Sequence, residues 1–400
     1  MAGVTVSGGA GDTITLPFAS GQNAVLAQAL ADAVTQAVSA GTLTPVTYTG
    51  AGLAPGIAGT EDEVVIKASG PLSLSPEAVA VVDTAANSVL FGSGALNETV
   101  LSGSGALTFF TRGGSGTIAT GDGNNRIIQS GTSPWSINTG AGNDQISIAG
   151  GLNTISAGTG HNTILLNGGN NLVNSTGSDT ITANIGSDTI AASGNGPVRV
   201  SATNADITFI GGNGAATVLG GAGTDTIFAT AGGYFQGGTA GNNLIVGGNG
   251  PTTILGGGGG DVLDATGSAG TSLYAASGNE TLDGSLSSGN DLLQAGSGSD
   301  QLTGGFGRDT LIGGTGMDTM QGGFGKDVFQ FINGDASNAL IVDFSDVKGD
   351  SLNLKGFGSG EVGYALQHVQ YSPTGAVVTL SDNTKITLTN VSDLTKSSFS

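Results

Sequence analysis

The sequence predicts an all-β chain that coils as a parallel β-solenoid of nine-residue repeats, with a short N-terminal helix and a C-terminal β cap. Residues 286–330 repeat a nine-residue phrase five times without a break, and weaker copies of the same period extend back through residues 111–285. Residues 24–38 show the three-to-four-residue spacing of apolar side chains that indicates a helix. A fixed short period is typical of a coil in which each repeat packs on its neighbours.

The strongest copies fit the pattern G-G-x-G-x-D-x-U-x, where U is a large apolar residue. They occupy residues 304–312, 313–321 and 322–330, and two looser copies occupy residues 286–294 and 295–303. The acidic position holds Asp291, Asp300, Asp309, Asp318 and Asp327, and the U position holds Leu293, Leu302, Leu311, Met320 and Phe329.

Each repeat combines a turn with a short strand. Its glycines tolerate positive φ angles and close backbone contact, so they suit a turn. The D-x-U-x that follows places one apolar side chain inward between outward neighbours, as a strand does. Two nonapeptides then make one lap of 18 residues, and the U side chains stack inside with adjacent laps about 4.8 Å apart.

Stacked turns bring together the aspartates of repeats i and i+2 and the backbone carbonyls of the turns. Carboxylate and carbonyl oxygens are the ligands that the hard cation Ca²⁺ prefers. The sequence therefore predicts Ca²⁺ as the cofactor, bound between laps. The alternative is a solenoid whose aspartates only cap turns, without a metal.

The five copies resemble the RTX, or hemolysin-type, calcium-binding repeat, whose nonapeptides form a β-roll. The resemblance implies that the calcium-binding aspartates fall on two sides of the roll. One side takes Asp291, Asp309 and Asp327, and the other takes Asp300 and Asp318. It also implies secretion by the type I machinery, which would then be a partner, and a location outside the cell or on its surface.

Before residue 286 the same period continues with fewer acids. Six consecutive nonapeptides fill residues 211–264, and only Asp225 and Asp261 keep the acid there; the other four hold Ala216, Tyr234, Asn243 and Thr252. Asparagine keeps the turn, because it tolerates left-handed backbone and bonds its own backbone, but it lacks the carboxylate charge. We therefore predict a calcium-binding roll at residues 286–330 and a degenerate Gly- and Asn-rich solenoid at residues 111–285. Asp225 and Asp261 are further candidate metal ligands without clear partners.

Composition sets further limits. Glycine accounts for 75 of the 400 residues, and 30 acids against 10 bases give a formal charge of −20. A chain this acidic is a poor match for nucleic acid, which needs a basic protein surface. Without calcium the acids of stacked turns should repel one another, so folding and metal binding form one equilibrium. The lack of cysteine excludes disulfides and zinc thiolates.

The two ends differ from the repeats. We predict that residues 1–110 form an N-terminal segment of one helix and short strands, for capping or assembly, but no fold is predicted for residues 42–110. The helix should pack over the open end of the solenoid or onto a partner through the apolar face Val25, Leu26, Ala29, Leu30, Ala33, Val34 and Val38. Residues 331–400 resemble the capping strands of RTX rolls, and their last part, from Lys385, resembles an uncleaved type I secretion signal. We expect neither a cleavable N-terminal signal nor a membrane span.

A catalytic constellation is not found in the sequence. The two histidines, His161 and His368, lack the neighbours of a zinc H-E-x-x-H site, and no G-x-S-x-G elbow occurs. Close carboxylate pairs occur chiefly where calcium would take them. We therefore predict that the chain is not an enzyme.

Three functions remain open. The repeats occupy most of the chain and favour a secreted structural protein that folds on Ca²⁺ and self-assembles into a homopolymer, as a surface layer (S-layer) or biofilm-matrix fibre, through unpaired strand edges. The second is a monomeric adhesin for a glycan, a cell-surface polysaccharide or another surface, using Thr180, Thr182, Asn170 and Asn171. The third is a carrier tail whose enzymatic partner is another chain.

Overall fold

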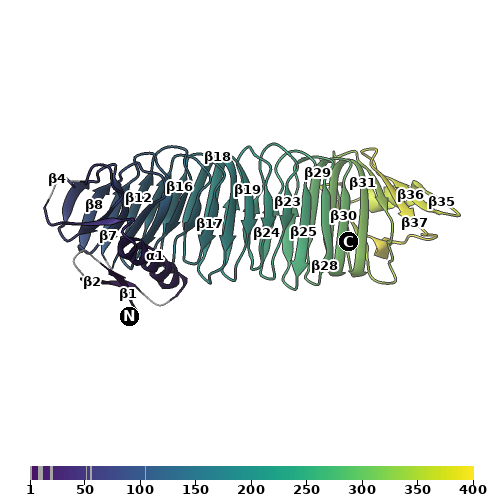
Figure 1. Ribbon diagram of the computed structural model, residues 1–400. Helices are drawn as coiled ribbons and strands as arrows, with labels where there is room; N and C mark the ends of the chain where they lie inside the picture. The colour runs from purple at the N-terminus through teal and green to yellow at the C-terminus, as the bar shows by residue number, and fades with distance from the viewer. Residues whose placement is uncertain (1, 8–11, 19–20, 51, 55, 104) are drawn as a thin grey trace. The chain divides into compact units, whose positions relative to one another are not determined.

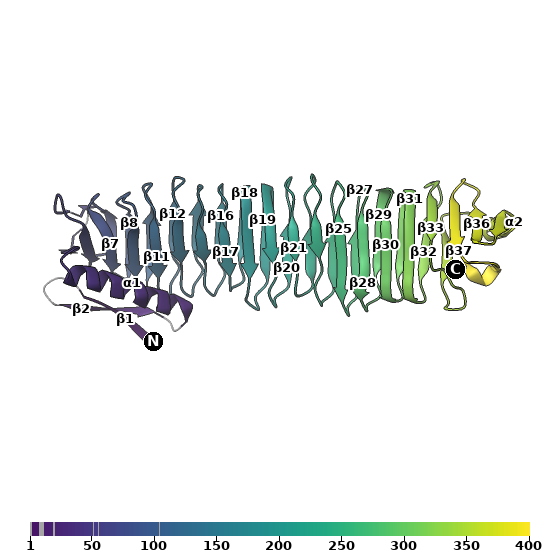
Figure 2. The same ribbon diagram turned by 45° about the vertical axis from the view of Figure 1, so that its right-hand side comes forward.

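Backbone pairing between successive laps organises nearly the whole chain. The computed structural model describes residues 2–7, 12–18, 21–50, 52–54, 56–103 and 105–400. The chain divides into two compact units, residues 1–205 (unit 1) and 206–400 (unit 2). Both are drawn in Figures 1 and 2, and both are built of parallel laps of strand and turn. This confirms the all-β parallel solenoid, which makes about 16 laps in total.

Unit 1 begins with an antiparallel hairpin and one helix and continues as short parallel strands. Its elements are β1 (Ala2–Ser7), β2 (Thr13–Phe18), α1 (Gln22–Ser39), β3 (Thr44–Tyr48), β4 (Gly52–Leu53), β5 (Asp62–Ile66), β6 (Gly70–Ser73), β7 (Ala78–Asp83), β8 (Asn87–Phe91), β9 (Glu98–Ser102), β10 (Ala106–Phe110), β11 (Gly116–Thr120), β12 (Arg126–Gln129), β13 (Trp135–Asn138), β14 (Gln145–Ile148), β15 (Thr154–Ser156), β16 (Thr163–Leu166), β17 (Leu172–Ser175) and β18 (Thr180–Ala192).

Unit 2 continues the pattern and ends in a small antiparallel cap. β19 (Val198–Ile210) begins before the unit boundary. The other elements are β20 (Ala216–Leu219), β21 (Thr226–Phe228), β22 (Gly233–Gln236), β23 (Leu244–Val246), β24 (Thr252–Leu255), β25 (Val262–Gly267), β26 (Thr271–Tyr274), β27 (Ser277–Gly278), β28 (Thr281–Ser287), β29 (Leu292–Gly298), β30 (Gln301–Gly307), β31 (Thr310–Gly325), β32 (Val328–Ile332), β33 (Asn338–Ile341), β34 (Ser351–Lys355), α2 (Glu361–Gln367), β35 (Val369–Ser372), β36 (Gly375–Thr379), β37 (Lys385–Thr389) and the short 3₁₀ helix η2 (Lys396–Ser398).

Each strand of a lap pairs with the strand one lap further along the chain. In unit 2, Leu293 of β29 pairs with Leu311 of β31, and Leu302 of β30 pairs with Met320 of β31. Both pairs are 18 residues apart, which confirms the lap of two nonapeptides. The turns depend on glycine: Gly305 and Gly307 have φ angles of 107° and 135°, which side chains with a Cβ rarely adopt.

The core of each unit is built around two main stacks of apolar side chains, one residue per lap. In unit 1 the stacks hold Ile118, Ile137, Ile155, Val173 and Ile190 on one side and Phe109, Ile127, Ile146, Ile164 and Ile181 on the other. In unit 2 the U residues Leu293, Leu302, Leu311, Met320 and Phe329 are at most 1% exposed, so they form the predicted core. Their burial stabilises the coil by about 1.5–3 kcal/mol per side chain as an upper estimate.

The parallel laps begin earlier than the sequence suggested. β3 pairs with β5, β5 with β7 and β7 with β9, so residues 44–102 already coil as later laps do. Hydrogen-bonded pairing also runs across the expected boundary at residue 110, because β10 pairs with β12. The count of laps therefore exceeds the number of recognisable repeats.

The predicted helix is confirmed as α1, and its buried face overlaps the predicted one only in part: Val34 is buried, and Leu30 and Val38 pack partly buried against the same cluster. Val25 is 72% exposed and Ala29 and Ala33 are also exposed. The buried stripe is Ala24, Ala27, Ala31 and Val34, and the helix contacts the β1–β2 hairpin, β9 and β11. Figure 2 shows α1 lying beside the hairpin and the laps. Small alanines allow this close contact on two sides, so apolar spacing identified Val34 but missed Ala24, Ala27 and Ala31.

Among the described residues, no helix has the length and apolar character needed to cross a membrane.

Candidate metal centre

Two rows of buried side chains, all acidic except Asn243, follow the laps of unit 2, with one member per lap. Row A contains Asp291, Asp309, Asp327 and Asp350, and row B contains Asp225, Asn243, Asp261, Glu280, Asp300 and Asp318. Every member is at most 2% exposed. The five aspartates of the strongest repeats thus lie on two sides, in the order that the resemblance implied.

One carboxylate oxygen of each aspartate in the rows joins two laps. Asp309 Oδ1 accepts the backbone N–H of Asp291 at 2.8 Å, and Asp327 Oδ1 accepts that of Asp309 at 3.0 Å. In row B, Asp318 Oδ1 accepts the N–H of Asp300 at 3.1 Å. These bonds satisfy backbone N–H groups that have no partner in the sheet at the turn. This is the turn-capping role that the aspartates would also have in a solenoid without metal.

Except at Asp350, the other oxygen of these aspartates accepts no hydrogen bond from a described residue. Among the described residues, buried Oδ2 atoms without a hydrogen-bond partner are found in these rows on Asp225, Asp261, Asp291, Asp300, Asp309, Asp318 and Asp327, and in unit 1 on Asp144 and Asp188. Desolvation, together with the negative charges of Asp291 and Asp327, raises the pKa of Asp309 to about 7, although the hydrogen bond from the Asp291 N–H lowers it. Desolvation likewise raises the pKa of Asp318 to about 6. A buried ionised oxygen without a partner is costly, so each position needs a proton or a cation.

Asparagine in the same rows shows what fills that place when the charge is missing. Asn243 Nδ2 donates to Gly238 O at 3.2 Å, to Gly256 O at 3.3 Å and to Asp261 Oδ1 at 2.9 Å. Unit 1 uses the same device, because Asn171 Nδ2 donates to Asp188 Oδ1 at 2.8 Å. The side-chain amide of Asn243 therefore donates hydrogen bonds to the two carbonyl oxygens and the carboxylate oxygen that surround it.

Where the row holds an aspartate in place of Asn243, the turn carbonyl faces a second carboxylate oxygen, and no N–H group of a described residue lies between them to donate a hydrogen bond. A Cβ placed on Gly304 would lie 2.5 Å from both Asp309 Oδ2 and Gly322 O. Gly304 and Gly322 stand five residues before and 13 after Asp309, which are the positions of Gly238 and Gly256 relative to Asn243. Carboxylate and carbonyl oxygens at one spot form a donor set that fits a hard cation such as Ca²⁺.

The carboxylates are arranged in rows and not as clusters. Within the part of the chain that the structure describes, no three Asp, Glu, His or Cys side chains form a ready metal-binding group. A bound cation would therefore need backbone carbonyls of the turns as ligands in addition to the aspartates.

Asp225 and Asp261, which lacked clear partners in the sequence, belong to row B. Asn243 lies between them: its Oδ1 accepts the N–H of Asp225 at 2.9 Å, and its own N–H donates to Asp261 Oδ1 at 2.8 Å. Desolvation raises the pKa of Asp225 to about 6. Because an amide separates the two acids, they are not adjacent carboxylates as Asp300 and Asp318 are.

Glu280 is a member of row B that sequence reasoning missed. It is 1% exposed, both of its carboxylate oxygens lack a partner among the described residues, and its N–H donates to Asp300 Oδ1 at 2.8 Å. Desolvation, followed by the nearby Asp300 and Asp261, raises its pKa to about 8. The signal was the string Gly278-Asn279-Glu280-Thr281-Leu282, in which Glu replaces Asp in the G-x-D-x-U pattern.

The C-terminal end of row A carries its own cation. Asp350 Oδ1 accepts the N–H of Asp327 at 3.2 Å, and its Oδ2 accepts the N–H of Ser345 at 2.8 Å. Lys348 Nζ lies 3.6 Å from Asp350 Oδ2 and donates to Gly323 O at 2.8 Å. The lysine ammonium thus meets a carboxylate and a turn carbonyl together at the last lap.

A family model described as the RTX calcium-binding nonapeptide repeat (4 copies) matches residues 148–175, 175–195, 208–233, 237–271, 274–311, 285–320 and 312–330. The matched residues include all seven predicted metal ligands and also Glu280. They extend into the Asn-rich laps, so the degenerate copies are of the same kind as the acidic ones. No curated protein and no solved structure matches the chain.

Proposed function

Because this chain is an RTX β-roll protein, with RTX repeats on a parallel β-solenoid, we propose that it is a secreted structural protein that folds on Ca²⁺ and self-assembles outside the cell. The observation that supports calcium-driven folding is the pair of rows in which buried Oδ2 atoms have no hydrogen-bond partner among the described residues. RTX repeats are calcium-binding motifs, and these oxygens supply the matching ligands.

The proposed ligands are the aspartates of the two rows, with turn carbonyls beside them. They are Asp291, Asp309, Asp327, Asp300 and Asp318, with Asp225, Asp261 and Glu280 as further ligands in row B. Bound Ca²⁺ would supply positive charge between carboxylates of neighbouring laps. The Oδ1 atoms meanwhile hold the backbone N–H of the preceding lap, so the cation would not have to order the turn by itself.

Without the cation, the rows oppose folding at neutral pH. Ionising Asp309 in the folded chain costs about 4 kcal/mol, since its pKa rises from 3.8 to about 7 and each unit is worth about 1.4 kcal/mol. Asp318 and Glu280 add penalties of similar size. Such costs together reach the total stability of a typical domain, about 5–15 kcal/mol. The acidic repeats should therefore stay unfolded until calcium binds.

This switch suits a chain that crosses an export channel unfolded. RTX-repeat proteins are typically secreted, and the family is associated with type I secretion. We place the secretion signal in the last residues, from Lys385, and the type I machinery as a partner. RTX-repeat solenoids are typically structural or adhesive, which supports a role without catalysis. The low calcium concentration inside the cell would keep the chain unfolded before export, and millimolar calcium outside would fold it after export.

Self-assembly is supported by an open strand edge in unit 1. Among the described strands, β3 pairs only with β5 and β4 only with β6, so the outer edges of the first lap carry unpaired backbone groups. In unit 2 the last laps are covered by the antiparallel strands β36 and β37. An unpaired edge is a template for another chain. A surface layer or a matrix fibre would result, with cell-surface polysaccharide as a possible support.

The proposal is tested on the full chain in EGTA and in calcium, with magnesium as the control cation. Circular dichroism should show a gain of β structure with calcium only, and negative-stain imaging should then show ordered polymers that EGTA dissolves. Thr47→Lys, on the exposed side of β3, should abolish polymers and leave the folding transition unchanged; Thr163→Lys, exposed on β16, is the matched control. A monomer of unchanged secondary structure under all conditions would rule the proposal out.

A second candidate function is a monomeric adhesin. Thr180 and Asn170 are exposed and Thr182 is half-buried, so they can contact a ligand. Asn171 cannot, because it is buried and bonded to Asp188. The polar groove described next is the specific observation that favours this role. Surface binding by a chain that never polymerises would support it.

A further inference from the structure

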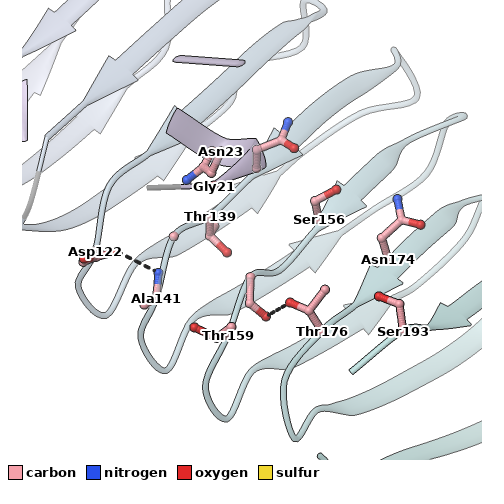
Figure 3. A pocket seen from close by; sticks show the side chains of 13 residues that line it. Gly21, Asn23, Asp122, Thr139, Ala141, Ser156, Thr159, Asn174, Thr176 and Ser193 are labelled. Carbon is pink, nitrogen blue, oxygen red and sulfur yellow. Dashed lines mark hydrogen bonds between the residues drawn. The ribbon is translucent and has the colours of Figure 1, made fainter. Parts of the chain in front are cut away.

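A polar groove lies on unit 1 beside the first turn of α1. It encloses about 520 Å³, within the range of about 300–1,000 Å³ that is typical of small-molecule sites. Figure 3 shows Thr139, Ser156, Asn174 and Ser193 on successive laps, with Asn23 of α1 close to them. The groove therefore extends across several laps and not along one strand.

The floor of the groove belongs to a row of side chains that changes character where α1 ends. By strand register this row runs through Val65, Val82, Leu101, Ala119, Asn138, Ser156 and Asn174. The first four are buried in the apolar cluster with α1 and the β1–β2 hairpin. The last three line the groove and are half-buried. The helix thus covers the apolar part of the face and leaves an amide and hydroxyl floor open.

Several polar atoms in the groove have unused hydrogen-bonding capacity. Asn23 Nδ2 donates to Thr120 O at 2.6 Å, but among the described residues Asn23 Oδ1 is buried without a partner. The side chains of Ser156 and Asn174 are likewise not engaged by any other described residue. Amides and hydroxyls both donate and accept, so a complementary ligand must offer both kinds of group.

The charge of the groove narrows the choice of ligand. Asp122 is the one charged side chain among the lining residues, and its Oδ1 already accepts the N–H of Ala141 at 3.0 Å. A chain of charge −20 repels anionic polymers. Polar groups that recur every lap, about 4.8 Å apart, favour an elongated ligand with repeated hydroxyls.

We propose that this groove binds a neutral oligosaccharide, whose hydroxyl groups pair with Asn23, Asn138, Ser156 and Asn174. The inference deepens the adhesin function and does not depend on calcium-driven assembly, since none of these side chains belongs to the acidic rows. Loss of saccharide binding would leave calcium folding intact, and loss of calcium folding of unit 2 would leave the groove residues unchanged.

The test uses the full chain in calcium and titrates cellohexaose, maltohexaose and the anionic hexagalacturonate by calorimetry and saturation-transfer NMR. At least one neutral hexasaccharide should bind, and the double variant Ser156→Ala with Asn174→Ala should weaken it at least tenfold, about 1.4 kcal/mol. Ser156→Trp should block binding by filling the groove. Thr163→Ala, exposed on β16, should leave the affinity unchanged, and thermal melts should show all variants folded.

Three outcomes would overturn the proposal. One is that no neutral hexasaccharide binds the parent chain at about 1 mM, a weak affinity of about −4 kcal/mol. Another is that the folded Ser156→Trp variant binds as the parent does. The third is that hexagalacturonate binds and the neutral sugars do not.

Discussion

Replacing Asp309 by Asn should make the metal-free repeats more stable and less dependent on calcium. In the folded chain Asp309 lies between Asp291 and Asp327 in row A, and its Oδ2 is buried without a partner among the described residues. An amide at this position can donate to Asp327 Oδ1, as Asn243 Nδ2 does to Asp261 Oδ1 at 2.9 Å. The substitution would thus replace an unpaired charge with a donor.

The magnitude follows from the raised pKa. Because the pKa of Asp309 is about 7 when folded and near 3.8 when unfolded, ionisation at pH 8 costs the folded state about 4 kcal/mol. Asp309→Asn removes that cost, so the free energy of unfolding in EGTA at pH 8 should rise by up to about 4 kcal/mol. At pH 4 the folded carboxyl is protonated, and the gain should fall below about 1 kcal/mol.

The assay is urea unfolding followed by far-ultraviolet circular dichroism, in EGTA and in calcium, at pH 8 and pH 4. Asp346→Asn is the matched control, because it removes the same charge from an exposed position outside the rows. The control should change stability by less than about 0.5 kcal/mol. If Asp309→Asn is less ordered than the parent in EGTA at pH 8, or no different from the control, the carboxylate rows do not oppose folding and the calcium argument fails.

Three further predictions concern the same rows. Acid should order the metal-free chain, because Asp309 and Glu280 have raised pKa values of about 7 and about 8 in the folded state. The stability gained by protonating them is full below about pH 4 and is lost as the pH rises to 8. β structure in EGTA that increases with pH would contradict this prediction. Asn243→Asp removes three amide hydrogen bonds and buries a charge. In urea titrations it should lower the free energy of unfolding in EGTA by about 3–5 kcal/mol, and calcium should restore part of that stability. Lys348→Ala should lower the free energy of unfolding by about 1 kcal/mol or less, since this lysine is partly exposed beside Asp350. It should also raise the calcium concentration at which half of the chain is folded. No change in that midpoint would show that the lysine does not neutralise row A.

The helix shows why local pattern was not enough for the N-terminal segment. The apolar residues of α1 are so numerous that several stripes fit helical spacing. The buried stripe is the one with the smallest side chains, Ala24, Ala27 and Ala31, because α1 is packed between a hairpin and the outer side of the laps. The spacing of apolar residues in the sequence indicates which side of the helix is apolar. It does not indicate how closely the helix approaches the hairpin and the laps.

The acidic rows show a related effect in the turns. Lap length varies: Asn162 bonds to Asp179, 17 residues on, whereas Glu280 bonds to Asp300, 20 residues on. A search at a fixed spacing of 18 finds the pairs around Asp309 and passes over Glu280. Near Glu280 the register between β25 and β28 shifts inside the strands, because Asp264 pairs with Asp283 whereas Thr266 pairs with Leu286. The sequence period therefore drifts while the spatial row continues.

The sequence by itself determined the parallel solenoid, the stacked apolar core and the two-sided placement of the acidic residues. These properties are periodic, and a period read along the chain becomes a row in space once each lap pairs with the next. Only the tertiary structure decided which carboxylate oxygen stays unpaired, where amides or Lys348 take the place of a cation, and which face α1 covers. Those features depend on contacts between laps of unequal length and on layers that meet at a fixed distance, and neither is encoded in local spacing.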